Sequence, residues 1–249
     1  MKRYFESFLL MVQMITRIPV KRSLPCQKED FRRGAGFFAL IGLIVGGIQY
    51  LLYLIFRKLF PAYVISILII LAEIFITGGF HIDGFGDTCD GYFAAKGKDK
   101  IIEIMKDSRI GTFACIGIVI NILIKFESYK FIAASNTLSL MIIVIPMLSR
   151  ASMLLISLIG RPAKTGGLGN LFINNVSLLQ VIINFLLPFA AVALIADPIK
   201  AVVLTAGVIT VTLSFNALCN SKINGITGDS LGAVNELSVL TALIIISSI

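Results

Sequence analysis

The chain has 249 residues, of which 57% are hydrophobic and only 14% are charged, against about 25% charged in soluble domains. This composition, with a mean hydropathy of +0.94, excludes an ordinary soluble domain and predicts an all-α, polytopic bundle of transmembrane helices. The formal net charge of +8 favours attraction to anionic lipid headgroups or an anionic substrate, and we expect no nucleic acid partner.

The N-terminal segment has a basic start followed by an interrupted apolar stretch. Glu6 and Gln13 break the apolar part, and no small-residue cleavage site follows it. A cleaved signal peptide is therefore disfavoured. We expect residues 4–15 to form an amphipathic helix in the membrane interface.

Apolar runs then follow one another along the rest of the chain. Each is close to the roughly 20 residues that cross a bilayer, so we predict about seven spans. Pro146 lies in the fourth run, which is long for one crossing and predicts a kinked or tilted helix. The runs cover residues 34–56, 61–80, 110–126, 131–160, 176–196, 199–219 and 231–249.

The basic residues predict the orientation of these spans, because short cytoplasmic loops are enriched in Lys and Arg. With the N-terminus inside, sixteen of the 22 basic residues fall on the cytoplasmic side and five fall outside. The sequence therefore predicts a cytoplasmic N-terminus. The five expected outside are Arg57, Lys58, Lys125, Lys130 and Lys200.

All long polar segments fall on that same predicted side. They are residues 16–33, 81–109, 161–175 and 220–230. With no linker and no internal repeat, residues 1–249 read as one membrane domain. The four cysteines form no CxxC pair, so we expect free thiols. A site open to the cytoplasm is favoured over a pore through the membrane.

Three aspartates mark the candidate centre of that site. Asp83, Asp87 and Asp90 have the i, i+4, i+7 spacing that places side chains on one face of a helix. Carboxylates so close repel one another, which predicts a cation among them. A hard divalent ion such as Mg2+, which takes oxygen ligands and is often shared with substrate phosphates, fits best. His81, the single histidine, is either a structural hydrogen bonder or a general base or phosphate contact.

A second segment carries cations. Lys106 and Arg109 are three residues apart and would share a helix face. Arg109 can grip phosphate oxygens with two nitrogen atoms, and Lys106 can act as a point charge, so together they form a candidate diphosphate clamp. The alternative is a basic flank of the next span with a surface pair between Asp107 and Arg109.

A third polar segment, residues 222–236, opens the last apolar run. Its glycines permit a close approach of backbones. Asp229 is a candidate site carboxylate, although Asp is also a good helix cap. We place Lys222, Thr227 and Glu236 among the candidate substrate contacts.

Two charged side chains lie within predicted spans. Glu236 is inside the last apolar run and Arg150 inside the fourth. Charged residues at such positions are usually functional. Arg150 is therefore a candidate substrate contact, with a structural ion pair to Glu73 or Glu236 as the alternative.

Four blocks together carry a family resemblance: Ile15–Pro19, Thr77–Gly91, Lys106–Gly111 and Thr227–Ala233. In this order they span nearly the whole chain, and the second is long and unusual. On these blocks the chain resembles the cobalamin synthase (CobS) family.

The resemblance implies a Mg2+-dependent transferase. Such an enzyme joins adenosylcobinamide-GDP to α-ribazole or its 5′-phosphate, releases GMP and forms adenosylcobalamin or its 5′-phosphate. Asp83, Asp87 and Asp90 would hold Mg2+, with Lys106 and Arg109 on the diphosphate. Asp229 would complete the site or bind a second metal, and one of the aspartates or His81 would accept the proton of the nucleophile.

The resemblance also implies a setting. We expect the prokaryotic cell (inner) membrane, with the active site facing the cytoplasm. Beyond the substrates and the lipid bilayer, further copies of the chain and other enzymes of cobalamin biosynthesis are expected partners.

Other classes of membrane protein also use aspartates near helices. A CDP-alcohol phosphotransferase would show an Asp-Gly-x-x-Ala-Arg core, and a UbiA-like prenyltransferase would show a second clustered aspartate motif. Neither is present. An ion-coupled transporter with an acidic pathway is a third alternative, which the one-sided polar segments disfavour.

Overall fold

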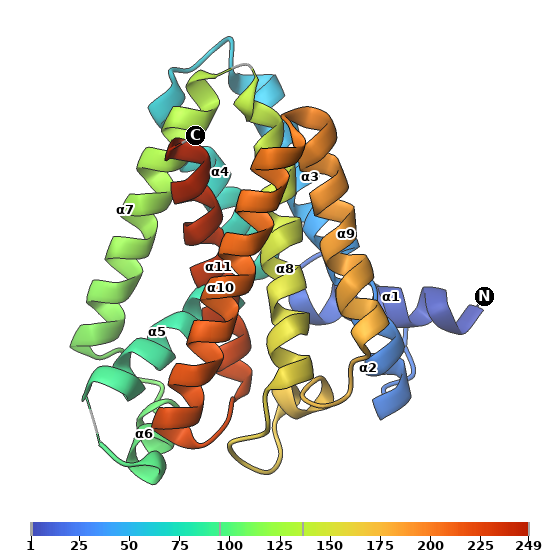
Figure 1. Cartoon of the computed structure of the whole chain (residues 1–249), viewed down its shortest axis with the longest axis vertical. Coiled ribbons are helices and arrows are strands. Elements are labelled where there is room, and N and C mark those ends of the chain that lie inside the picture. The colour runs from blue at the N-terminus through green and yellow to red at the C-terminus, as the bar shows by residue number, and fades with distance from the viewer. Residues whose placement is uncertain (1, 95, 136, 249) are drawn as a thin grey trace.

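The described part of the chain folds as a bundle of eleven α-helices and two short 3-10 turns (Figure 1). This computed structural model describes residues 2–94, 96–135 and 137–248. Within those ranges it contains no β-strand, only an isolated bridge between Pro162 and Ile226. The helices are α1 Lys2–Ile15, α2 Lys28–Ala35, α3 Phe38–Phe56, α4 Ala62–Thr77, α5 Phe80–Ala94, α6 Lys98–Ile104, α7 Thr112–Ala134, α8 Met141–Ile159, α9 Leu178–Ile195, α10 Pro198–Ile223 and α11 Gly228–Ser248, with 3-10 turns at Leu138–Leu140 and Leu168–Leu171.

Six of these helices are long and apolar enough to cross a membrane, namely α3, α7, α8, α9, α10 and α11. The shorter α4 makes a seventh with α5, from which it is bent by 90°. The all-α fold and the count of about seven spans are thus confirmed. The last predicted run ends at residue 249, which lies outside the described residues.

One predicted boundary was wrong. The run 131–160 was expected to be a single long span, but α7 continues to Ala134 and α8 starts only at Met141. Lys125 and Lys130 consequently lie inside α7 instead of in an outer loop. The charge of a lysine is costly in a bilayer, which favours a position outside a span. Buried acidic partners offset that cost for Lys125.

Helix α8 forms the centre of the bundle. Most of its length is buried, and it packs between α3 and α11. Two glycines of α3 make the close contact possible: Gly42 faces the backbone at Pro146, and a Cβ atom at Gly46 would lie only 2.5 Å from the carbonyl oxygen of Ile143. Small residues at helix contacts are typical of membrane bundles.

A two-glycine turn separates the aspartate helix from the span before it. Gly78 and Gly79 have φ values of +66° and +71°, a region that glycine adopts without steric cost. The turn bends the chain by 90°, so that α5 runs across the end of the bundle instead of continuing the direction of α4. There α5 packs along α11, where a Cβ atom at Gly84 would lie 2.9 Å from the carbonyl oxygen of Asp229.

The four polar segments all gather at one end of the bundle, the lower end in Figure 1. At this end α1 lies across the bundle and not along it (Figure 1). It buries Leu10, Met11 and Ile15 on one side and leaves Lys2 and Arg3 exposed. This agrees with the predicted interfacial amphipathic helix. All four cysteines are free thiols, as expected.

Candidate active site

Asp83 and Asp87 line a cavity of about 280 Å³ at the polar end. Both project from α5, confirming that this stretch is helical. Asp83 is exposed and Asp87 is half-buried. The opposite wall carries Lys106 and Arg109, from the loop that joins α6 to α7. The structure therefore brings two predicted carboxylates and both predicted cations to one cavity.

The cation loop has a different conformation from the one predicted. Residues 105–111 are not helical, so Lys106 and Arg109 do not share a helix face. Asp107 accepts hydrogen bonds from the backbone and the guanidinium of Arg109, with Nη2 2.6 Å from Oδ2. These bonds hold the pKa of Asp107 at about 2. The surface pair is thus present, and Arg109, whose side chain is 87% exposed, still borders the cavity.

Asp90 faces a different partner from the other two aspartates. Its carboxylate accepts hydrogen bonds from the backbone N–H groups of Gly111, at 2.6 Å, and Ala114, at 2.8 Å. These groups lie at the start of α7, where four N–H groups have no partner within the helix. Asp90 therefore caps α7 from a neighbouring helix and fixes the end of the cation loop.

Asp229, from α11, approaches α5, the helix that carries the three aspartates. It lies in the first turn of α11, but the cap is made by Thr227, whose hydroxyl accepts the Ser230 N–H at 3.3 Å while Ser230 Oγ accepts the Thr227 N–H at 3.0 Å. The alternative that Asp229 merely caps the helix was wrong. Within the described residues, its carboxylate accepts a hydrogen bond only from the Thr227 hydroxyl, at 3.2 Å.

The carboxylates crowd one another strongly enough to affect their charge. The half-buried carboxylate of Asp87 lies within the field of three like charges, those of Asp83, Asp229 and Asp90. Such repulsion favours a bound cation. Among the described residues, no three His, Cys, Asp or Glu side chains already form a closed ligand set. Asp83 and Asp87 instead offer an open two-carboxylate site, the arrangement in which Mg2+ keeps waters and shares substrate phosphates.

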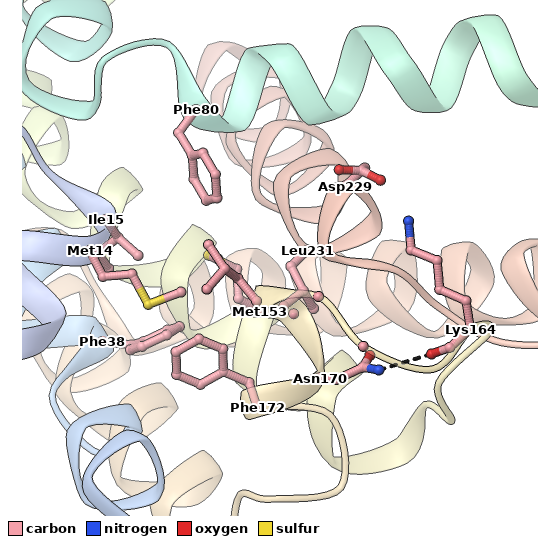
Figure 2. A pocket seen from close by; sticks show the side chains of 15 residues that line it. Met14, Ile15, Phe38, Phe80, Met153, Lys164, Asn170, Phe172, Asp229 and Leu231 are labelled. Atoms are coloured by element: carbon pink, nitrogen blue, oxygen red, sulfur yellow. Dashed lines mark hydrogen bonds between the residues drawn. The ribbon is translucent and has the colours of Figure 1, made fainter. Parts of the chain in front are cut away.

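A second cavity, of about 240 Å³, borders α5 at Phe80 and is also lined by Asp229 (Figure 2). Its walls are apolar, and Phe80 of α5 points into it (Figure 2). Lys164 and Asn170 border the same cavity, and Asn170 Nδ2 donates to the Lys164 carbonyl oxygen at 2.9 Å. A wider opening of about 520 Å³ shares Lys164 with this cavity and Lys106 with the charged one.

Comparison with known proteins identifies the family. Residues 7–247 match the CobS family, described as cobalamin-5-phosphate synthase. The chain belongs to this family.

Named relatives resemble the chain over nearly its full length. A protein of Clostridium tetani (strain Massachusetts / E88) is 51% identical over 236 residues, which cover 94% of this chain and 93% of that protein. A protein of Clostridium kluyveri (strain ATCC 8527 / DSM 555 / NBRC 12016 / NCIMB 10680 / K1) is 43% identical over 248 residues, 99% and 98% of the two chains. Both are called adenosylcobinamide-GDP ribazoletransferase. No solved structure matches the chain.

In this CobS family member, two predicted substrate contacts lie inside the bundle instead of at the cavities. Glu236 pairs with Lys125 of α7 at 2.7 Å, and Lys125 also pairs with Glu73 of α4 at 3.0 Å. Arg150 is fully buried and donates from Nη1 to the Pro146 carbonyl oxygen at 3.1 Å. The expected ion pairing of Glu73 and Glu236 is present, but its cation is Lys125.

Three further predicted residues line neither cavity. His81 is buried, and among the described residues its Nε2 atom has no hydrogen-bond partner. Lys222 donates to the carbonyl oxygen of Tyr92 at 3.0 Å, near the end of α5. Thr227 is the cap of α11 described above. Lys222 and Thr227 thus hold the helices that carry the site.

Sequence reasoning missed the importance of Lys164 and Phe80. Lys164 lies in the polar segment 161–175, for which the sequence predicts only a cytoplasmic position. Two successive glycines, Gly166 and Gly167, have φ values of +78° and +97° and allow that loop to fold over the cavity. The glycine pair was the available signal, since such pairs mark tight turns near ligands.

Proposed function

We propose that the chain is a Mg2+-dependent adenosylcobinamide-GDP ribazoletransferase of the prokaryotic cell (inner) membrane. It would join adenosylcobinamide-GDP to α-ribazole or its 5′-phosphate and release GMP, in the last steps of cobalamin biosynthesis. The observation that carries this proposal is the cavity in which Asp83 and Asp87 face Lys106 and Arg109. Family membership and the names of the relatives support the choice of substrates.

The residues of this cavity suit a diphosphate that has a metal ion bound to it. Asp83 and Asp87 would hold Mg2+, with Asp229 close to them, and the metal would neutralise charge on the transferring phosphate. Lys106 and Arg109 would contact the diphosphate oxygens from the opposite wall. Asp107 would then compete with phosphate for Arg109, so substrate must displace part of that surface pair.

The reaction is a substitution at phosphorus. A ribose hydroxyl oxygen of ribazole attacks the phosphorus attached to cobinamide, and the bond from that phosphorus to the bridging oxygen breaks. The bridging oxygen leaves with GMP, and the hydroxyl proton passes to a carboxylate. Asp229, which borders both the apolar cavity and the aspartate helix, is placed to accept it. Positioning and charge neutralisation supply most of the rate in such transfers.

We propose that the polar end of the bundle faces the cytoplasm, with the N-terminus on that side. The excess of Lys and Arg on the segments of this end supports the orientation. Lys125 lies within the bundle, so it no longer counts among the five basic residues expected outside. The excess of basic residues on the cytoplasmic side is therefore larger. Association with further copies or with other enzymes of the pathway stays a prediction.

The direct test supplies purified protein in lipid vesicles with adenosylcobinamide-GDP, α-ribazole and Mg2+. The expected result is stoichiometric GMP and corrinoid product, both lost when the metal is chelated. Failure to form product under conditions in which a relative called adenosylcobinamide-GDP ribazoletransferase is active would reject the function. The same assay with the substrates of a CDP-alcohol phosphotransferase or of a UbiA-like prenyltransferase tests these two alternatives, and we expect no product from either.

A further inference from the structure

We propose that the apolar cavity beside Asp229 binds the aromatic base of the ribazole substrate, with Lys164 contacting its ribose or 5′-phosphate. This inference rests on the proposed function and assigns one substrate to one of the two cavities.

The walls of the cavity suit a flat aromatic ring. Three phenylalanines, Phe38, Phe80 and Phe172, come from separate elements and meet there with Met153 and Leu231 (Figure 2). Aromatic rings pack favourably in offset or edge-to-face arrangements, and thioethers adapt to their edges. Phe38 and Phe172 already contact each other edge-on, with centroids 5.3 Å apart. The third ring, Phe80, is 44% exposed and free to cover a bound base.

The chemistry of the walls distinguishes among the four ring systems of the two substrates. Guanine and the adenine of the adenosyl group carry several donors and acceptors, which would be left unpaired against phenylalanine, methionine and leucine at a large cost. A corrin ring with its amide arms is much larger than a cavity of about 240 Å³. A dimethylbenzimidazole has two apolar methyl groups and one free ring nitrogen, so it alone matches both the size and the polarity.

Three polar side chains line the cavity, those of Lys164, Asn170 and Asp229. The Lys164 amine and the Asp229 carboxylate approach each other there (Figure 2). A ribose attached to the buried base would lie between these two side chains. Lys164 would then bind a 5′-phosphate or hydroxyl, while Asp229 would face the attacking hydroxyl.

The position of the cavity also suits the geometry of the transfer. It borders α5 at Phe80, and the cavity with Lys106 and Arg109 borders the same helix at Asp83, Gly86 and Asp87. In phosphoryl transfer the attacking and leaving oxygens are roughly in line across phosphorus. Ribazole in the apolar cavity and GMP in the charged one would occupy separate places along this helix, with the phosphorus between them.

The first test measures KM separately for the two substrates in Phe80→Ala. We expect KM for α-ribazole to rise about tenfold or more, because the ring covers the base, while KM for adenosylcobinamide-GDP changes less than about twofold. Phe93→Ala is the matched control, since Phe93 lies on the same helix, is 69% exposed and packs on Phe113 away from the cavity. An equal rise for both substrates, or no rise for α-ribazole, would overturn the assignment.

The second test reads binding without turnover. The chain has no tryptophan, so Phe80→Trp adds a single reporter at the cavity. The proposal predicts a saturable change in its fluorescence on adding α-ribazole alone, even in a preparation that lacks transferase activity. If lipids with brominated acyl chains quench the reporter and α-ribazole does not affect it, the cavity is a lipid site and the proposal is wrong.

Lys164→Met separates the two forms of the acceptor. With Lys164 on the 5′-phosphate, KM for α-ribazole 5′-phosphate rises about tenfold or more while KM for α-ribazole changes little. Equal effects on both forms would contradict a phosphate contact by this residue.

Discussion

The carboxylate of Asp90 accepts a hydrogen bond from the backbone N–H of Gly111 at 2.6 Å. This bond joins the aspartate helix to the loop that carries Lys106 and Arg109, because Gly111 ends that loop. The fit is close, since a Cβ atom at Gly111 would lie 2.5 Å from the same carboxylate. The third aspartate thus sets the position of the cations relative to Asp83 and Asp87.

Asp90→Asn should therefore act on the loop more than on the metal. An amide keeps one acceptor but loses the charge that strengthens both bonds, a cost of about 1.5–3 kcal/mol in unfolding free energy. We expect a higher KM for adenosylcobinamide-GDP and a lower melting temperature, with the Mg2+ concentration for half-maximal activity nearly unchanged. A large shift in the Mg2+ requirement at unchanged stability would show that Asp90 is itself a metal ligand.

The buried ion cluster predicts a strong effect from one lysine. Lys125→Met leaves Glu73 and Glu236 buried without their cation, which should cost about 3–5 kcal/mol in unfolding free energy. Lys130→Met is the control, because Lys130 lies on the same helix but pairs with Glu127 on the surface, where such pairs contribute about 0–1 kcal/mol. Thermal unfolding in detergent measures both variants.

Neutralising the two acids should rescue the first variant. Adding Glu73→Gln and Glu236→Gln to Lys125→Met removes the unpaired buried charges, so much of the lost stability should return. If Lys125→Met and Lys130→Met unfold at the same temperature, the cluster does not contribute as described.

Two adjacent glycines of α3 provide a packing test. Gly46 contacts α8 so closely that a Cβ atom would lie 2.5 Å from the Ile143 carbonyl oxygen, whereas a Cβ atom at Gly47 would meet nothing within 4 Å. Gly46→Ala should lower the unfolding free energy by about 1–3 kcal/mol through overpacking. Gly47→Ala should raise it by up to about 1 kcal/mol, because alanine favours the helix. The opposite order in thermal unfolding would contradict the α3–α8 contact.

The native cysteines test the orientation. Cys26 is exposed in the polar segment before α2, whereas Cys89 and Cys219 are buried. In a Cys115→Ser background, a membrane-impermeant maleimide should label Cys26 in inverted vesicles and not in intact cells. Lys58→Cys, at the opposite end of the bundle, should show the reverse pattern once Cys26 is replaced by Ser. Labelling of Cys26 from outside would place the site on the other face.

Much of this architecture could be predicted from local patterns. The spacing of Asp83, Asp87 and Asp90 predicted a shared face if their stretch is helical, and the stretch is helical. Apolar runs predicted the spans. Lys125 was misplaced because its partners lie 52 and 111 residues away, and a local hydropathy pattern contains no such pairing.

Local hydrogen bonding explains the other errors. The cation loop was expected to be helical, but Asp107 accepts the Arg109 N–H at 3.0 Å, a local bond that competes with helix formation. The choice between Thr227 and Asp229 as cap also depends on backbone geometry, since both residue types cap well. The apolar cavity joins residues from six separate parts of the chain, which no sequence pattern brings together.

The most direct test of the central claim compares GMP release by the wild-type chain and by Asp87→Asn across a Mg2+ titration. Because Asp87 is crowded by other carboxylates, we expect a variant that is folded and at least as stable, yet slower by about 100-fold or more, as expected when a contact to transition-state charge is lost. Asp197→Asn at the start of α10, far from the site in sequence and a helix cap, should keep full turnover. Wild-type turnover and Mg2+ dependence in Asp87→Asn would show that Asp87 does not hold the metal.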